Sequence, residues 1–195
     1  MTSRAAGLAI LGMLALTVAA PAIACPPGHA LARPSAAELS EGEALYLPTP
    51  QRVVDAMLRL ANVGPDDVLY DLGSGDGRIP ITAARRFAIR AVGIELDARK
   101  IAEARCNARE SGVEQRVEFR QADVFEADFR EASVVTLFLF PEMILRLRPR
   151  LRAELAPGTR IVSHRFDLGD WPPDQRAEVD GHAIFLWIVP PRGTR

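Results

Sequence analysis

The sequence predicts one α/β domain built on a single doubly wound, mostly parallel seven-stranded sheet with a C-terminal antiparallel hairpin. From residue 68 onward, short apolar runs alternate with segments that carry apolar residues at helical spacing. This alternation is typical of parallel sheets whose strands are joined by right-handed helical crossovers. The first run, Val68–Leu72, leads directly into a turn with three glycines, Gly73, Gly75 and Gly77. A length of 195 residues suits one domain with one buried core.

Turn and cap residues delimit the expected elements. Thr49 as N-cap and Pro50 at the first helical position open a helix that Gly64 ends. The expected strands are Val68–Leu72, 91–94, Val117–Gln121, 134–140 and 159–164, followed by a hairpin that pairs 176–179 with 182–189. The other expected helices are Arg78–Phe87, the segment between the cap Asp97 and the stop Gly112, and 149–155. The run at 134–140 is almost entirely apolar, as a central strand buried on both faces requires.

The first 24 residues predict a secretory signal peptide. Arg4 precedes a largely apolar run that is too short to span a membrane comfortably, and Ala22-Ile23-Ala24 has the small residues of a cleavage site. Cys25 follows directly, so a lipidated first mature residue is an alternative to an ordinary cysteine. The expected organisation is a signal peptide over residues 1–24, a linker over 25–44 and the α/β domain over 45–192.

The leader predicts a periplasmic or envelope-associated protein, or a cytoplasmic one if these residues are not a leader. Membrane proximity would come through the leader or a lipidated Cys25. A net charge of −1 gives no basic field that would attract nucleic acid, so we expect no nucleic-acid partner. We also expect a monomer. Cys25 and Cys106 form neither a zinc-binding spacing nor a disulfide framework, so we expect no metal site and treat Cys106 as a small apolar helix residue.

The glycine-rich turn has the spacing D-x-G-x-G-x-G, with Asp71 before the first glycine and Asp76 inside the turn. A dinucleotide fingerprint has the spacing G-x-G-x-x-G, and a phosphate-binding P-loop ends in Gly-Lys-Ser/Thr, so neither is present. Two carboxylates would repel a pyrophosphate, but they suit a ligand that carries an ammonium and a sulfonium group. The glycines, with Ser74 between them, let such a ligand approach the backbone closely.

Two further carboxylates stand near the ends of the next strands. Glu95 ends the second strand, where an acid accepts hydrogen bonds from ribose hydroxyls, and Leu96 lies beside it. Asp123 ends the third strand, where it could accept a hydrogen bond from an adenine amino group while Val124 or Phe125 covers the ring. Each acid alone could simply be a solvated carboxylate at a strand end. Because the carboxyl ends of parallel strands meet at one edge of the sheet, together they predict one ligand site.

Residues 68–78 resemble motif I of the class I S-adenosylmethionine (SAM) methyltransferases, and matches to that pattern cover most of residues 45–190. A narrower resemblance rests on the segments YLPTP (46–50), YDLGSGDGRI (70–79) and LFLFPEM (137–143). They resemble a group whose characterised members methylate lysines of the ATP synthase c subunit and the adenine nucleotide translocase. Residues 157–164 and Trp171-Pro172 fit its bacterial branch. The resemblance implies a Rossmann-like methyltransferase fold, SAM as the cofactor and a protein lysine as the methyl acceptor.

The resemblance also implies roles for single residues. Tyr46 and Thr49 would approach the cofactor from the N-terminal side, and the loop at 140–142 would face the acceptor. A lysine acceptor needs little catalytic apparatus, because a neutral amine held in line with the methyl group reacts by proximity. Glu142 is a candidate for orienting or deprotonating the amine, although the helix dipole alone explains an acid at a helix start. His164, at the carboxyl end of a strand, is a candidate base, although such a histidine often only bonds nearby backbone.

Two alternatives to lysine methylation stay open: methylation of a small molecule, and a non-catalytic SAM- or nucleoside-binding protein of the cell envelope. The second follows from the leader, since SAM is made in the cytosol. The sequence lacks the Asn/Asp-Pro-Pro-Tyr tetrapeptide with which some methyltransferases grip planar nitrogens, which argues against DNA adenine or glutamine as the acceptor. Arg146, Arg148, Arg150 and Arg152 form either a phosphate-binding patch or a solvated helix flank.

Overall fold

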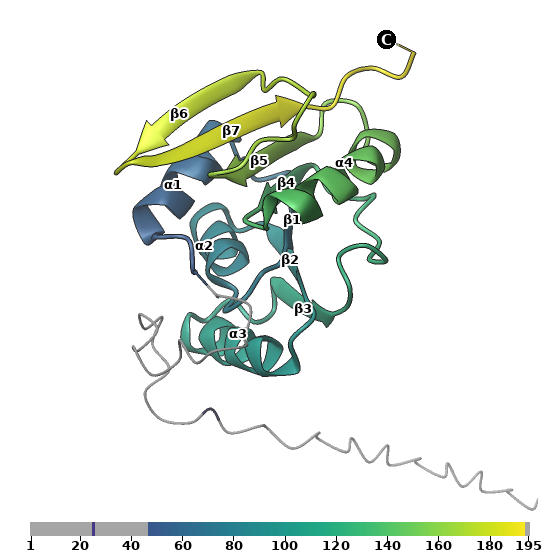
Figure 1. Cartoon of the computed structure of the whole chain (residues 1–195). Helices are drawn as coiled ribbons and strands as arrows, with labels where there is room; N and C mark the ends of the chain where they lie inside the picture. Colours follow the sequence, from purple (N-terminus) through teal and green to yellow (C-terminus); the bar gives the residue numbers. More distant parts are fainter. Residues whose placement is uncertain (1–24, 26–46, 194–195) are drawn as a thin grey trace, which may run out of the picture.

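The computed structural model describes Cys25 and residues 47–193, which fold into four helices and seven strands (Figure 1). The strands are β1 (Val68–Leu72), β2 (Arg90–Glu95), β3 (Val117–Gln121), β4 (Val134–Leu137), β5 (Arg160–His164), β6 (Gln175–Val179) and β7 (His182–Ile188). The helices are α1 (Gln51–Leu60), α2 (Arg78–Phe87), α3 (Ala98–Glu110) and α4 (Pro141–Glu154). The predicted signal peptide, Tyr46 and the predicted linker other than Cys25 lie outside the described residues.

The seven strands form one sheet in the order β3-β2-β1-β4-β5-β7-β6. Strands β3, β2, β1, β4 and β5 run parallel to one another. β7 runs antiparallel to both β5 and β6. Asp180 and Gly181 join β6 to β7 with φ angles of 52° and 76°, the left-handed geometry that a tight hairpin turn favours. This topology confirms the predicted doubly wound sheet with its C-terminal hairpin.

Helices cover both faces of the sheet (Figure 1). Apolar residues of α1, α2 and α3, among them Val54 and Ile81, pack on one face. Ile144 and Leu147 of α4 pack on the other. The central strands β1 and β4 are therefore buried on both sides, as their largely apolar runs predict. Because the helices cover the two faces of the sheet, a ligand site is expected at its edge, where the carboxyl ends of the parallel strands lie.

The segment after β4 differs from the prediction. β4 ends at Leu137 instead of continuing to residue 140, because Phe140 becomes the cap residue of α4 and Pro141 takes its first position. Proline is favoured there, since its φ angle is preset and its missing amide hydrogen has no helical partner at that position. The helix predicted over 149–155 therefore begins earlier, and Pro149 lies inside it. The buried apolar stripe along α4 holds the helix to the sheet on both sides of this proline.

The start of α1 also differs from the prediction. Thr49 does not cap the helix; Pro50 occupies the cap position, without a side-chain cap hydrogen bond. The Thr49 hydroxyl instead lies 3.1 Å from Nδ1 of His164, at the end of β5. A tertiary hydrogen bond has replaced the expected local one, and it anchors the chain before α1 to the carboxyl edge of the sheet.

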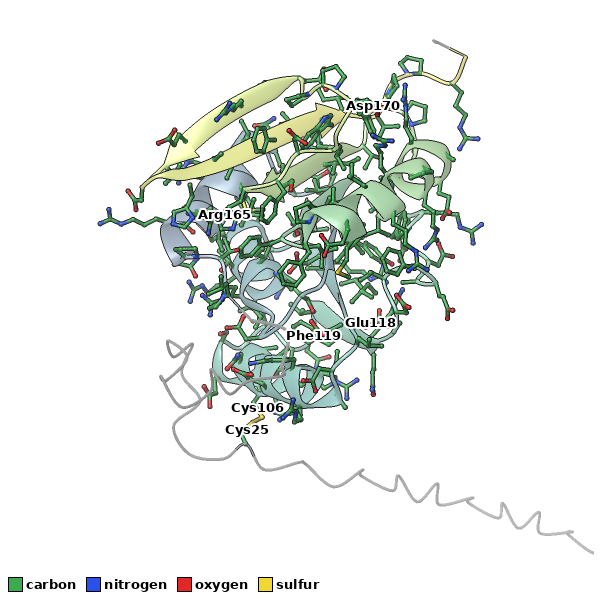
Figure 2. The ribbon with its side chains drawn as sticks, viewed as in Figure 1. Cys25, Cys106, Glu118, Phe119, Arg165 and Asp170 are labelled. Carbon is green, nitrogen blue, oxygen red and sulfur yellow. A yellow bond between two sulfur atoms is a disulfide. The ribbon has the colours of Figure 1, made fainter. Side chains whose placement is uncertain are left out.

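Cys25 and Cys106 form a disulfide bond, which fastens residue 25 to α3 (Figure 2). The expectation that no disulfide forms and that Cys106 is only a small apolar residue is therefore wrong. The two cysteines lie 81 positions apart, so no local pattern in the sequence connects them, yet their Cα atoms lie 5.5 Å apart. A sulfur held in this bond cannot also carry a lipid thioether. Within residues 47–193, no helix combines the length and apolarity that crossing a membrane requires.

Candidate functional site

The glycine-rich loop follows β1 and folds back over the end of β2. The amides of Gly73 and Ser74 both donate to the carbonyl oxygen of Ile94, each at 2.9 Å. Gly73 has a left-handed φ of +82°, and a Cβ atom there would lie 2.5 Å from Cδ2 of Leu139. Gly77 adopts the same left-handed conformation, with φ of +80°. Residues with side chains rarely adopt this conformation, so the loop presents a backbone surface to a ligand.

Glu95 joins the end of β2 to this loop. Its Oε2 accepts a hydrogen bond from the amide of Gly75 at 2.9 Å. Its Oε1 accepts from the amides of Leu96 and Asp97 at 2.8 and 3.0 Å. A carboxylate has about four acceptor positions, so the backbone fixes Glu95 and still leaves capacity for a ligand hydroxyl. Leu96 is 66% exposed although it is apolar, which suits a surface that a ligand covers.

Asp71 is buried near the end of β1, and the Thr136 hydroxyl donates to its Oδ1 at 2.7 Å. The pKa of Asp71 is raised to about 8, mainly by burial and further by the negative charges of Asp76 and Glu95. The hydrogen bond from Thr136 opposes this rise. A positively charged ligand would therefore be bound favourably, because it would stabilise the ionised carboxylate.

Asp76 forms contacts that hold the glycine-rich loop in place. Its carboxylate forms an ion pair with Arg78, whose Nε donates to Oδ1 at 2.9 Å. Nη1 of Arg78 also donates to the carbonyl oxygen of Thr49 at 3.0 Å. Asn107 of α3 donates from Nδ2 to the carbonyl oxygen of Asp76 at 2.9 Å. These contacts fix the loop to the chain before α1 and to α3.

Asp123 lies two residues beyond the end of β3. The amide of Ala122 donates to the carbonyl oxygen of Glu95 at 3.0 Å, which keeps the ends of β3 and β2 together. Oδ1 of Asp123 accepts from the amide of Phe125 at 2.9 Å. Val124 is buried in the apolar core of the α4 face. Asp123 is thus brought to the same edge of the sheet as Glu95.

These residues fit a positively charged adenosine derivative. Because β3, β2 and β1 are adjacent and parallel, Asp123, Glu95 and Asp71 stand along one edge, as the sequence predicts. The left-handed glycines leave the loop without Cβ atoms in the way. The buried hydroxyl of Ser74 has no hydrogen-bond partner within the described residues, so it is available to a ligand or water. An ammonium, a sulfonium and ribose hydroxyls would supply the charge and donors that this edge can accept.

A second group of side chains lies at the same edge, beside β5. His164 is 1% exposed; its Nδ1 lies 3.1 Å from Oγ1 of Thr49, and its Nε2 lies 2.9 Å from Nδ1 of His182. The ring centroid of Phe138 lies 4.1 Å from that of His164. The ring of Phe166 stacks on Phe138 at 6.4 Å. Two aromatic rings therefore lie beside a chain of three polar side chains, of which Thr49 and His164 are buried and His182 is partly exposed.

His164 is neutral at physiological pH. Its pKa is lowered to about 4, first by burial and then by the nearby charges of His182 and Arg165. A neutral imidazole has one nitrogen that can accept a hydrogen bond or a proton. Glu142, the other predicted catalytic residue, is exposed in the first turn of α4, where the helix dipole favours a carboxylate. No hydrogen bond or ion pair within residues 47–193 joins Glu142 to His164.

Sequence reasoning missed three residues that complete these clusters: Thr136, Arg78 and His182. Thr136 is the only polar residue of β4, and this interruption of an apolar strand is a signal that could have identified it. Arg78 gave no signal beyond its place at a helix start. His182 could be found only from the hairpin register, since it lies two residues before Ile184, the residue paired with His164.

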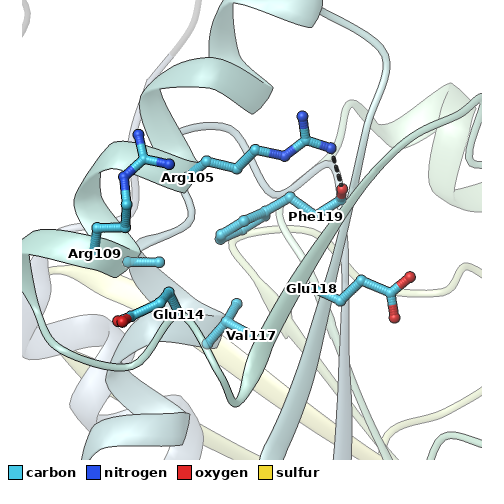
Figure 3. Close-up of a pocket in the computed structure, with 7 residues that line it drawn as sticks. Arg105, Arg109, Glu114, Val117, Glu118 and Phe119 are labelled. Carbon is cyan, nitrogen blue, oxygen red and sulfur yellow. Dashed lines mark hydrogen bonds between the residues drawn. The ribbon is translucent and has the colours of Figure 1, made fainter. Parts of the chain in front are cut away.

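A cavity of about 340 Å³ lies elsewhere, between the end of α3 and the start of β3 (Figure 3). It is lined by Arg105, Ala108, Arg109, Glu114, Val117, Glu118 and Phe119. Arg105 spans it and donates to the carbonyl oxygen of Phe119 at 3.0 Å. Because Val117 begins β3, the cavity lies at the amino end of that strand, away from the acidic edge. We place no part of the candidate site there.

Comparison with known proteins identifies a family. Residues 71–175 match the model of the ANTKMT methyltransferase domain. A protein-lysine N-methyltransferase of Saccharolobus islandicus is 44% identical over 149 residues, which cover 74% of this chain and 92% of that protein. The adenine nucleotide translocase lysine N-methyltransferase of Mus musculus is 36% identical over 129 residues, which cover 66% of this chain and 56% of that protein. This chain thus spans about half the length of the mouse relative.

A solved structure is similar over a comparable share of the chain. The crystal structure of an RNA methyltransferase from Salinibacter ruber, in complex with S-adenosyl-L-homocysteine (SAH), is 55% identical, with a TM-score of 0.73. The match covers 74% of this chain and 94% of that one. SAH is SAM without its methyl group, so the ligand of that structure has the adenosine and amino acid groups that the acidic edge fits. This chain belongs to the ANTKMT methyltransferase-domain family and is a class I SAM-dependent methyltransferase.

Proposed function

We propose that this methyltransferase transfers the methyl group of SAM to the ε-amine of a protein lysine. The lysine methyltransferase names of the Saccharolobus islandicus and mouse relatives support the proposal. The observation that carries it is the aromatic cluster at the same edge of the sheet, where Phe138 lies against neutral His164 and Phe166 stacks on Phe138. Apolar surroundings lower the pKa of a lysine ammonium, so they favour the neutral amine that can react.

In this proposal, three acids hold the cofactor: Asp71 through charge, Glu95 through the ribose hydroxyls and Asp123 through the adenine amino group. The loop from Gly73 to Gly77 supplies backbone contacts. When bound, SAM supplies a methyl group on a positively charged sulfur, and the lone pair of the amine forms the N–C bond as the C–S electron pair returns to sulfur. The chain itself positions the amine and keeps it neutral, and such positioning accounts for much of the rate in reactions of this kind.

RNA is the other acceptor class to consider, because the Salinibacter ruber relative is an RNA methyltransferase. The arginines of α4 would be its expected contacts. Arg148 instead forms an ion pair with Asp170, and Arg150 forms one with Glu154. The guanidinium groups of the other two arginines lie over aromatic rings. With these groups engaged inside the domain and a net charge of −1, the structure favours a protein acceptor over an RNA backbone.

Labelling of separated fractions distinguishes the acceptors. The protein is incubated with methyl-labelled SAM and, in parallel, with protein, RNA and small-molecule fractions from one cell extract. We expect label in the protein fraction that protease releases and ribonuclease does not, and we expect none with Asp71→Asn. Label in RNA would contradict the proposal, and label in the small-molecule fraction would support the alternative acceptor. SAH binding without transfer to any fraction would instead identify a non-catalytic binding protein.

We further propose that the mature protein works in the cell envelope. Cys25 stands directly after the predicted cleavage site, and its disulfide bond with Cys106 supports an oxidising compartment. This location requires SAM to reach that compartment. Mass spectrometry of the protein isolated from cells tests the proposal, with and without reduction before alkylation. We expect Cys25 as the first residue and both cysteines blocked until reduction; a retained leader with two free thiols would contradict it.

A further inference from the structure

We propose that Thr49, His164 and His182 form a proton relay, which carries the proton of the acceptor amine from the site to solvent. The inference rests on the proposed lysine methylation and names the residues that prepare its acceptor. None of the three was connected to the others by the sequence.

The reaction creates the need for such a route. The pKa of a lysine side chain in water is about 10.4, so on the order of one side chain in a thousand is neutral near pH 7. Only the neutral amine has a lone pair to give. An amine that lies against Phe138 and Phe166 therefore needs another group to take its proton, since these rings cannot accept it.

The three side chains form an unbroken path. Oγ1 of Thr49 lies 3.1 Å from Nδ1 of His164, and Nε2 of His164 lies 2.9 Å from Nδ1 of His182. Thr49 and His164 are 3% and 1% exposed, whereas His182 is only partly buried. The path therefore begins inside the domain and ends at its surface.

The position of each end matches this direction. Thr49 lies beside the cofactor loop, because its carbonyl oxygen accepts from Arg78, which is paired with Asp76. His182 begins β7 and directly follows the exposed Gly181 of the hairpin turn. His164 connects them from the end of β5, one residue before Arg165 (Figure 2).

The state of His164 suits a relay. Burial first, and then the charges of His182 and Arg165, lower its pKa to about 4, so one ring nitrogen stays free to accept a proton. Arg165 follows His164 and acts on its pKa, Arg78, which is paired with Asp76, donates to the carbonyl oxygen of Thr49, and Asp180, which is paired with Arg52, lies two residues before His182. The two ion pairs carry no net charge, so they neither hold a proton on His164 nor repel one strongly.

The transfer balances if His164 carries its proton on Nε2. The lysine ammonium gives a proton to Oγ1 of Thr49 and becomes the neutral amine, while the hydroxyl proton of Thr49 passes to Nδ1 of His164. The Nε2 proton of His164 passes to Nδ1 of His182, and the Nε2 proton of His182 passes to water. Each relay group keeps its number of protons, and one proton has left the amine. No oxidant or further reactant is required.

Three variants and one matched control test the relay, with poly-L-lysine as the acceptor. Thr49→Val removes the first group, His164→Gln keeps two hydrogen bonds without a transferable proton, and His182→Ala removes the exit. Thr159→Val is the control, because Thr159 is also 3% exposed and its hydroxyl donates to the Ala132 carbonyl at 3.1 Å. In single-turnover experiments near pH 7 we expect each relay variant to be about 100-fold slower than wild type and the control to be unchanged.

The pH dependence separates a relay from a structural role. At about pH 9 more of the amine is already neutral, so the defect of the relay variants should shrink to about tenfold or less. A residue that only held the chain before α1 in place would slow the reaction by the same factor at both pH values and weaken SAH binding. Added imidazole should restore part of the rate of His182→Ala near pH 7 and none of the rate of Thr49→Val.

Nitrogen NMR of the histidine rings gives a reading that needs no acceptor. We expect His164 to carry its proton on Nε2; a proton on Nδ1 would make Thr49 the acceptor of that bond and would overturn the relay. The relay would also be overturned if all three variants had the same rate and the same pH profile as wild type. If one variant does not fold, the other two decide. A wild-type protein that methylates no lysine would instead overturn the proposed function itself.

Discussion

The amide of Gly75 donates a hydrogen bond to Oε2 of Glu95 at 2.9 Å, between residues 20 positions apart. The other oxygen of the same carboxylate is held by the amides of Leu96 and Asp97. The glycine-rich loop and the end of β2 are thus fixed to each other by one side chain. A site that is ordered in advance loses less conformational freedom when it binds a ligand.

Glu95→Gln should weaken SAH binding. A glutamine amide cannot accept hydrogen bonds on both sides, so it would leave at least one of the three backbone amides without its partner. We expect affinity to fall about 10- to 100-fold, or about 1.4 to 2.8 kcal/mol, in isothermal titration calorimetry. Glu118→Gln is the control, because Glu118 is an exposed residue of β3. Equal affinity of both variants would show that Glu95 does not organise the loop.

Asp71 should make stability depend on pH. Its pKa of about 8 in the folded chain lies above the ordinary value of 3.8, so folding retains a proton that the unfolded chain releases. Between about pH 4 and 8, this group therefore lowers the free energy of unfolding as pH rises, by up to about 1.4 kcal/mol per pH unit.

Asp71→Asn removes this titration and keeps an acceptor for the Thr136 hydroxyl. In urea unfolding at about pH 5 and about pH 7.5, the variant should lose less stability between the two values than wild type does. Parallel behaviour of the two proteins would contradict the proposed state of Asp71.

Reduction of the disulfide bond should destabilise the domain. Cys25 and Cys106 lie 81 positions apart, and a cross-link over such a loop is worth about 4.5 kcal/mol in the chain-entropy model. We expect dithiothreitol to lower the melting temperature by roughly 10 °C. A variant with both cysteines changed to serine should melt at the reduced value and ignore dithiothreitol. Identical melting of the oxidised and reduced wild type would show that the bond contributes no stability.

Gly73→Ala should cost more than Gly158→Ala. Both glycines have a left-handed φ, of +82° and +87°, so alanine costs about 1 to 2 kcal/mol at either position. Only at Gly73 would the new Cβ also meet a neighbour, at 2.5 Å from Leu139, whereas nothing lies within 4 Å at Gly158. In chemical unfolding, Gly73→Ala should therefore lower the free energy of unfolding more than Gly158→Ala does. Only Gly73→Ala should weaken SAH binding. Similar losses at both positions would mean that Leu139 moves aside freely.

The sheet and its acidic edge were predictable because their signals are local. Val68–Leu72 is apolar along its whole buried length except for Asp71, and its glycines follow at once. Glu95 lies at the end of a strand and Asp123 just beyond one, and parallel pairing alone brings such positions together. The predicted bounds of β1, α2 and β3 match those of the structure.

The remaining features depend on contacts between distant parts of the chain. Thr49 has the residue type and position of a helix cap, but it bonds to His164, 115 positions away. The pairing of Cys25 with Cys106 leaves no pattern in either neighbourhood. Pro149 suggested a helix start, although the favourable first position belongs to Pro141. In each case a tertiary contact or a second local signal outweighed the first.

The chemical identity of the methylated product decides whether this enzyme methylates protein lysine. Protein labelled by the purified enzyme and methyl-labelled SAM is hydrolysed in acid, and the amino acids are separated and identified by mass spectrometry. We expect label in methylated lysine, and none when Asp71→Asn replaces wild type. Label in any other amino acid, or in lysine with the variant as strongly as with wild type, would contradict this expectation.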